Sequence, residues 1–155
     1  MKNERRESVQ QLPYCHSFER YFEFNGETVD RLALILEHGL LSPEAAEEKG
    51  IPYKRLPFQV TGIQGYYDVI FLHSTQQRMG MPKLGNVVLY FGTLSVFTYE
   101  EMQKNNPGWF VASIGEVYAK GQIPPTEIKR IKLMGGNKED VLSMVKKFGL
   151  NVEII

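Results

Sequence analysis

The sequence predicts one α+β domain over residues 1–155, with helices early and late in the chain and strands concentrated between them. Its 155 residues are enough for one hydrophobic core and too few for two. Apolar residues recur at helical spacing near the start and the end, whereas β-branched and aromatic runs fill the middle. No repeat, low-complexity tract or linker divides the chain.

The early part of the chain predicts a strand, a turn and two helices. Residues 12–24, "LPYCHSFERYFEF", are aromatic and extended, and "NGE" follows them as a turn. We expect a helix with Thr28 as its N-cap and Gly39 as its C-terminal stop, and a second, short helix that starts after Ser42 and ends by Gly50. The apolar face of the first helix consists of Val29, Leu32, Ile35 and Leu36.

The later part predicts strands and one last helix. Apolar residues in the range 51–67 show no regular spacing, which predicts an irregular surface segment. Strands are expected at "DVIFLHST", "NVVLYFGTLSVF", "WFVASIGEVYAKG", "EIKRIKL" and "LNVEII", with loops at 76–85 and 98–108. Asn137 and Asp140 predict a reciprocal N-cap for a helix whose apolar face carries Val141, Leu142 and Val145.

The composition is that of an ordinary globular chain, with 43% hydrophobic and 23% charged residues. Eighteen basic residues balance eighteen acidic ones. The chain therefore has no net positive charge to attract nucleic acid or an acidic membrane surface. Residues 51–155 are the more basic part, with twelve Lys or Arg against eight Asp or Glu, so an anionic ligand is expected there. The single cysteine and a polar start predict a cytoplasmic location without a membrane partner, with delivery as a toxin or effector left open.

Classical nucleophile, metal and phosphate motifs have weak support. Cys15 lies beside His16, a pairing that could supply a thiolate nucleophile and its base. Successive side chains of a strand point to opposite faces, so we favour a buried, inert Cys15 over a catalytic one. His38 and His73 could supply a base, although no pattern places either one there. The three histidines lack ligand spacing, so we expect no metal. Neither "GIQGYY" nor "LMGGNK" has the spacing of a phosphate-binding loop.

Three stretches, in order, carry a family resemblance: "YCHSF", "DRLALILEHGLLS" and "GEVYAKGQIPPTEI". Together they resemble the ADP-ribosyltransferase superfamily, particularly the compact bacterial branches related to rifampin ADP-ribosyltransferases and to DNA-modifying ADP-ribosyltransferase toxins. The resemblance spans about residues 14–133. It implies a split central, mainly antiparallel β-sheet that forms a cleft for NAD, from which ADP-ribose is transferred to an acceptor with release of nicotinamide.

The resemblance also assigns roles to residues. Glu116 would be the catalytic carboxylate, because cleavage of the bond between ribose and nicotinamide passes through an oxocarbenium-like state that a neighbouring carboxylate stabilises. His16 would hydrogen-bond a ribose hydroxyl, and either Tyr67 or Tyr90 would stack on nicotinamide. The remaining candidates for NAD binding are Ser17, where many relatives have glycine, and Ser74. A hairpin-like insertion, "ERYFEFNGETV", also departs from the family pattern.

The acceptor would be selected by the loop "TYEEMQKNNPGW" before the catalytic residue, with Lys104, Asn105, Asn106 and Trp109 as contacts. Ile114 stands where arginine-modifying relatives carry Gln or Glu, which disfavours transfer to arginine. The zero net charge favours a protein or small-molecule acceptor over nucleic acid. The alternative reading is a catalytically inactive relative that binds a nucleotide or a partner protein through the same cleft.

Overall fold

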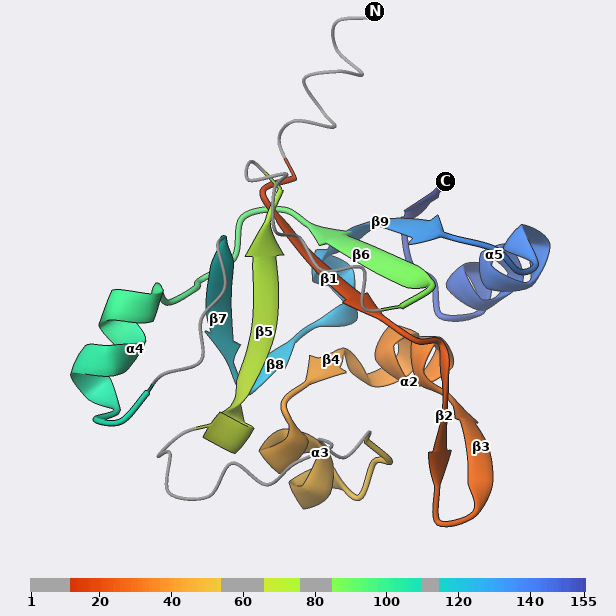
Figure 1. Cartoon of the computed structure of the whole chain (residues 1–155). Coiled ribbons are helices and arrows are strands. Elements are labelled where there is room, and N and C mark those ends of the chain that lie inside the picture. Colours follow the sequence, from red (N-terminus) through yellow and green to blue (C-terminus); the bar gives the residue numbers. More distant parts are fainter. Residues whose placement is uncertain (1–11, 54–65, 76–84, 110–114) are drawn as a thin grey trace, which may run out of the picture.

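The computed structural model describes residues 12–53, 66–75, 85–109 and 115–155. They form a mixed α+β structure around a six-stranded sheet with the order β10-β9-β6-β1-β5-β7, as Figure 1 shows. All neighbouring strands are antiparallel except β10 and β9, which are parallel. The strands of this sheet are β1 (Tyr14–Phe18), β5 (Val69–Ser74), β6 (Val87–Phe91), β7 (Glu116–Lys120), β9 (Ile128–Leu133) and β10 (Glu153–Ile154).

Two short ribbons accompany the main sheet. The first pairs β2 (Tyr21–Phe24) with β3 (Glu27–Asp30) through a turn at Asn25 and Gly26. Both turn residues have positive φ, at 51° and 81°, which matches the twist of a two-residue hairpin and confirms the predicted turn. The second ribbon pairs β4 (Leu40–Leu41) with β8 (Gln122–Ile123).

The sheet divides between β1 and β5. These strands pair only at Tyr14 with Ser74 and at Cys15 with His73. In contrast, β1 pairs with β6, and β5 with β7, at five positions each. Beyond Cys15 the two strands run apart, as the course of their ribbons in Figure 1 shows. Backbone groups along this divergence need partners other than the neighbouring strand.

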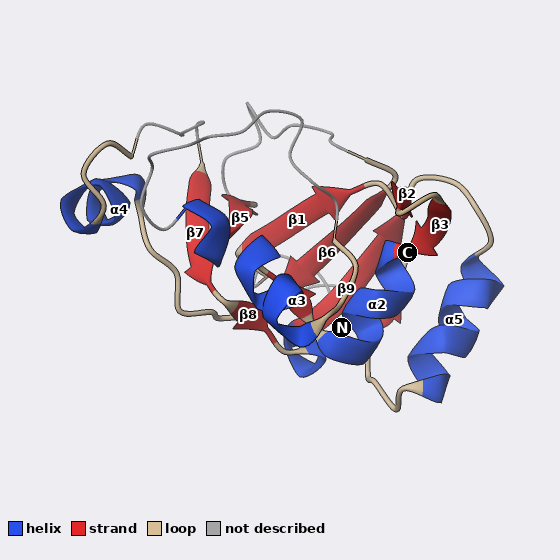
Figure 2. Cartoon of the chain, turned by 90° about the horizontal axis from the view of Figure 1, so that it is seen from below, coloured by secondary structure: helices blue, strands red, loops and turns tan. Residues whose placement is uncertain are grey.

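The helices gather into two regions (Figure 2). Helices α2 (Arg31–His38), α3 (Pro43–Lys49) and α5 (Lys138–Lys147) lie around one part of the sheet, and α4 (Tyr99–Asn105) lies beyond β7. Single turns of 3₁₀-helix are present at Tyr66–Asp68 and Pro125–Glu127. The larger core joins α2 and α5 to the strands, while a smaller core contains Val69, Met102, Trp109 and Tyr118. No helix in the described ranges is long and apolar enough to cross a membrane.

The predicted first helix is present, but it starts two residues later than expected. Its N-cap is Asp30, whose carboxylate accepts a hydrogen bond from the Ala33 amide, whereas Thr28 and Val29 belong to β3. Thr28 is wrong as an N-cap because the hairpin uses its backbone for the ladder with β2. Gly39 ends the helix as predicted, with φ +90°. A Cβ there would lie 2.5 Å from the carbonyl oxygen of Ile123, so only glycine fits.

A helix that the sequence interpretation missed occupies most of the predicted loop 98–108. Helix α4 starts at Thr98, whose hydroxyl accepts from the Glu101 amide while the Glu101 carboxylate accepts from the Thr98 amide. The sequence pattern Thr-x-x-Glu is typical of a capping box, and it could have predicted this helix. The segment before the predicted catalytic residue is therefore ordered by a helix along much of its length.

The second and last helices confirm most of their predicted signals. Ser42 caps α3 and Gly50 ends it with a left-handed conformation. Asn137 caps α5 by accepting from the amides of Glu139 and Asp140. Two expectations for α5 are wrong: the Asp140 carboxylate does not return to the cap but binds Arg20, and Leu142 is 38% exposed.

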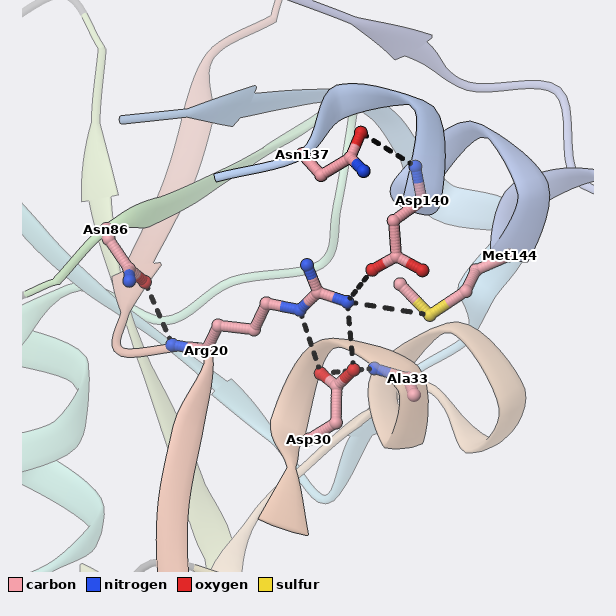
Figure 3. Close-up of polar contacts among 7 residues, drawn as sticks. All are labelled: Arg20, Asp30, Ala33, Asn86, Asn137, Asp140 and Met144. Carbon is pink, nitrogen blue, oxygen red and sulfur yellow. Dashed lines mark hydrogen bonds and ion pairs between the residues drawn. The ribbon is translucent and has the colours of Figure 1, made fainter. Parts of the chain in front are cut away.

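Arg20 joins three parts of the chain (Figure 3). Its guanidinium donates to both carboxylate oxygens of Asp30, at 3.2 and 3.0 Å, and to Asp140 at 2.6 Å. Its backbone amide donates to the side chain of Asn86. Because Arg20 is 8% exposed and its partners belong to β3 and α5, it fastens the hairpin and the C-terminal helix to the end of β1.

Candidate functional site

Glu116 is the first residue of β7, an edge strand of the described sheet. Its Oε1 accepts a hydrogen bond from the Tyr118 hydroxyl at 2.6 Å. The two side chains meet because residues two apart on a strand share a face. Burial and this hydrogen bond both raise the pKa of Tyr118, so its hydroxyl keeps its proton and remains a donor to the carboxylate. The sequence analysis missed Tyr118, although the alternation Glu116-x-Tyr118 was available as a signal.

Glu116 lies in a row of residues that crosses the sheet. It is the register partner of His73 on β5, His73 is the partner of Cys15 on β1, and Cys15 is the partner of Tyr90 on β6. Direct partners in antiparallel strands present their side chains on the same face. The row therefore brings a thiol, an imidazole and a carboxylate onto one face, which the sequence did not reveal.

Thiolate chemistry in this row is disfavoured by the environment of Cys15. The residue is 1% exposed, and burial raises the pKa of its thiol to about 11. A buried thiol with a raised pKa is a poor nucleophile. Burial also lowers the pKa of His73, with the charge of Glu116 acting in the opposite direction. Cys15 is thus buried, as the sequence predicted.

His16 lies where β1 leaves β5. Its Nδ1 is 2.7 Å from the carbonyl oxygen of Phe71, and this contact fixes the tautomer with the proton on Nδ1. Burial lowers the pKa of the imidazole to about 3, with a further lowering from the Arg31 charge. Nε2 is consequently a hydrogen-bond acceptor, and it is buried with no hydrogen-bond partner among the described residues.

The structure does not bring His16 and Glu116 into one row. By alternation along β1, Cys15 shares the face of Glu116 and His16 belongs to the other face. Both predicted residues nevertheless rest on the same segment of β5, since His16 contacts the Phe71 carbonyl and Glu116 pairs with His73. The pairing of β1 with β5 ends at Cys15, next to His16. The backbone hydrogen bonds between these two strands therefore do not continue past this point.

The other predicted NAD-binding residues are scattered around this divergence. Ser17 follows His16, and its Oγ is buried with no hydrogen-bond partner among the described residues. Ser74 is paired with Tyr14 at the closed end of the divergence. Tyr67 is 39% exposed before β5, and Tyr90 is half-buried on β6 with the Arg130 guanidinium 5.9 Å from its ring centre.

The predicted acceptor contacts divide into exposed and buried residues. Lys104 and Asn105 are exposed on α4, whereas Asn106 is 7% exposed and donates to the carbonyl of Met102. Trp109 is 1% exposed, and its ring packs against those of Phe71 and Tyr118. Trp109, predicted as an acceptor contact, is therefore part of the smaller core, and its ring contacts core residues. Ile114 lies outside the described residues.

Within the described part of the chain, no group of three His, Cys, Asp or Glu side chains could hold a metal ion. Comparison of the chain with family models, with curated proteins and with solved structures finds no match. The fold and the residues at the divergence are thus the basis for any functional assignment.

Acid should destabilise the protein partly through His16. The pKa of His16 is lowered from 6.5 to about 3 in the folded state, so the unfolded state binds a proton that the folded state excludes. This contribution to stability is complete above about pH 6.5 and is lost as the pH falls towards 3. Urea unfolding from pH 7 to 4 should show a slope that His16→Gln reduces by up to about 1.4 kcal/mol per pH unit. His38→Gln is the matched histidine control, and an unchanged slope in His16→Gln would contradict the prediction.

Proposed function

We propose that the chain transfers ADP-ribose from NAD to an acceptor and releases nicotinamide. The observation that supports this proposal best is the neutral imidazole of His16, fixed at the divergence of β1 and β5, whose buried Nε2 is an acceptor without a hydrogen-bond partner among the described residues. A ribose hydroxyl can donate to such a nitrogen, whereas a protonated imidazole could only donate. Because His16 and Glu116 belong to opposite faces of the sheet, the proposal requires NAD to contact them where β1 and β5 are no longer paired, beyond Cys15.

Glu116 supplies the carboxylate in this proposal. As the glycosidic bond to nicotinamide lengthens, positive charge develops on the ribose, and a neighbouring carboxylate lowers the energy of that state. The Tyr118 hydroxyl orients the Glu116 side chain through its 2.6 Å hydrogen bond. His73 on β5 pairs with Glu116 on β7 and with Cys15 on β1. It thereby positions the edge strand β7 relative to β1.

For the acceptor we propose a protein or a small molecule. The balanced charge of the chain supports this choice, because tight nucleic-acid binding depends on displaced counterions and hence on a basic surface. Helix α4 presents the exposed Lys104 and Asn105 beyond β7, and β7 is the strand that begins with Glu116. These two residues remain the proposed acceptor contacts, while Asn106 and Trp109 support the helix from the interior.

Incubation with NAD, with and without candidate protein and small-molecule acceptors, tests the proposal directly. Mass analysis should detect nicotinamide together with an acceptor, or water, that has gained ADP-ribose. A heat-denatured sample of the same chain provides the control for spontaneous NAD breakdown. NAD binding without any nicotinamide release would favour the inactive relative that binds a nucleotide. The absence of both would contradict transfer and NAD binding, and would leave an inactive relative that binds a partner protein.

A further inference from the structure

Arg31 is a partly buried cation to which the sequence analysis gave no role. It is the first residue of α2, and its backbone amide donates to the Arg20 carbonyl. Its guanidinium lies over the ring of Phe18, with 5.0 Å between Cζ and the ring centre. The residue is partly exposed to solvent, yet burial lowers the pKa of its guanidinium to about 10.

The other arginines in the described ranges are paired with carboxylates. Arg20 binds Asp30 and Asp140, and Arg130 binds Glu153 at 2.9 Å. Arg31 has no carboxylate within ion-pair distance among the described residues. Its neighbour Asp30 is engaged elsewhere, since one oxygen caps Ala33 and both bind Arg20. Arg31 is partly buried and has no counterion among the described residues, so its guanidinium is a candidate binding group for an anion from outside the chain.

Arg31 also lies close to the imidazole of His16, whose buried Nε2 has no hydrogen-bond partner among the described residues. The two side chains pack against the same ring, because the His16 and Phe18 ring centres are 5.8 Å apart and the Arg31 charge acts on the imidazole. A guanidinium offers only donors, and it matches the oxygens of a phosphate in a bidentate fork. His16 Nε2 offers only an acceptor, which suits a hydroxyl. The pair therefore complements an anion joined to a hydroxyl-bearing group.

We propose that Arg31 binds the diphosphate of a nucleoside diphosphate while His16 Nε2 accepts a hydrogen bond from a hydroxyl of the adjoining ribose. The proposal depends on the proposed function only for the identity of the ligand, which would be the ADP-ribose part of NAD. Phe18 holds the guanidinium in place through its ring face, so that little side-chain entropy is lost when the anion arrives. Arg31 is then a binding residue and not a catalytic one.

Calorimetric titration with ADP-ribose and with adenosine tests this role. Arg31→Met keeps the stem that packs on Phe18 and removes the charge, and we expect it to weaken ADP-ribose binding by about 10- to 100-fold. Arg31→Lys keeps the charge but loses the fork, and should give an intermediate loss. Adenosine has no phosphate, so its affinity should change little in either variant. Lys129→Met, which removes an exposed cation on β9, is the matched charge control and should bind ADP-ribose like the wild type.

A stability measurement separates binding from folding. Arg31 has no ion-pair partner to lose in the described part of the chain, so Arg31→Met should unfold at a temperature no lower than the wild type. Should it fail to fold, Arg31→Lys and the salt dependence of wild-type ADP-ribose binding report on the charge instead, and wild-type affinity in Arg31→Lys together with no salt dependence would overturn the proposal. Unchanged ADP-ribose affinity in Arg31→Met, an equal loss for adenosine, or no ADP-ribose binding by the wild type would each overturn the proposal as well.

Failure of this inference is distinguishable from failure of the proposed function. A wild-type chain that binds ADP-ribose through Arg31 but releases no nicotinamide would refute transfer and support the binding role. A chain that releases nicotinamide at the same rate in Arg31→Met and wild type would support transfer and refute the binding role.

Discussion

Glu116→Gln is expected to lower nicotinamide release from NAD by about 10²- to 10³-fold, a loss typical of one preorganised electrostatic contact to a developing charge. The substitution removes the negative charge and keeps the shape, and the new amide oxygen can still accept the Tyr118 hydroxyl. Binding of NAD should be mostly retained, because the contact gains its strength in the transition state. Turnover under saturating NAD, measured beside the dissociation constant for NAD, checks both statements.

Glu127→Gln is a suitable control for the loss of one carboxylate. Glu127 lies in the 3₁₀ turn before β9 and is half-buried like Glu116. Its variant should turn over NAD at the wild-type rate. Normal turnover in Glu116→Gln would remove this carboxylate from the mechanism and leave the nucleotide-binding alternative. A parallel loss of NAD affinity and unfolding temperature would instead assign Glu116 to the stability of β7.

Arg20→Met is expected to cause the largest loss of stability, about 2–4 kcal/mol in the free energy of unfolding. The substitution takes away the cation that binds two carboxylates and leaves Asp30, whose side chain is 26% exposed, beside an apolar group. Three chain segments lose their common anchor (Figure 3). Denaturant unfolding should show a lower midpoint with little change in slope, and the melting temperature should fall by roughly 2–4 °C per kcal/mol.

Asp140→Asn provides the graded comparison. The Asp140 side chain is 49% exposed, so solvent screens its ion pair with Arg20 and its loss should cost less than about 1 kcal/mol. The order of stability should therefore be wild type, Asp140→Asn and then Arg20→Met. Equal stability of Arg20→Met and the wild type would show that the network contributes nothing net, as happens when desolvation cancels the attraction between buried charges.

Local structure followed from local signals along the chain. Ser42, Gly50 and Asn137 act as helix ends because capping depends on atoms within a few residues. The strands around Cys15 and His73 were readable from β-branched and aromatic runs. Where the reading of local signals failed, as for Thr28 and the helix after Thr98, a competing local signal was present in Asp30 and in the capping box.

Arrangement of the candidate site depended on contacts between distant residues. Strand order and register decide that Glu116 pairs with His73 and that His16 contacts the Phe71 carbonyl. The alternation of side chains along a strand indicates which residues share a face, but it gives no information on which strands become neighbours. Burial of Trp109 likewise results from packing against β5 and β7. Asp140 binds Arg20 across 120 positions. Asp30 also binds Arg20, and Arg31 is left without a carboxylate among the residues that the structure describes. Only the folded chain brings such groups together, since no interaction between neighbours in sequence determines them.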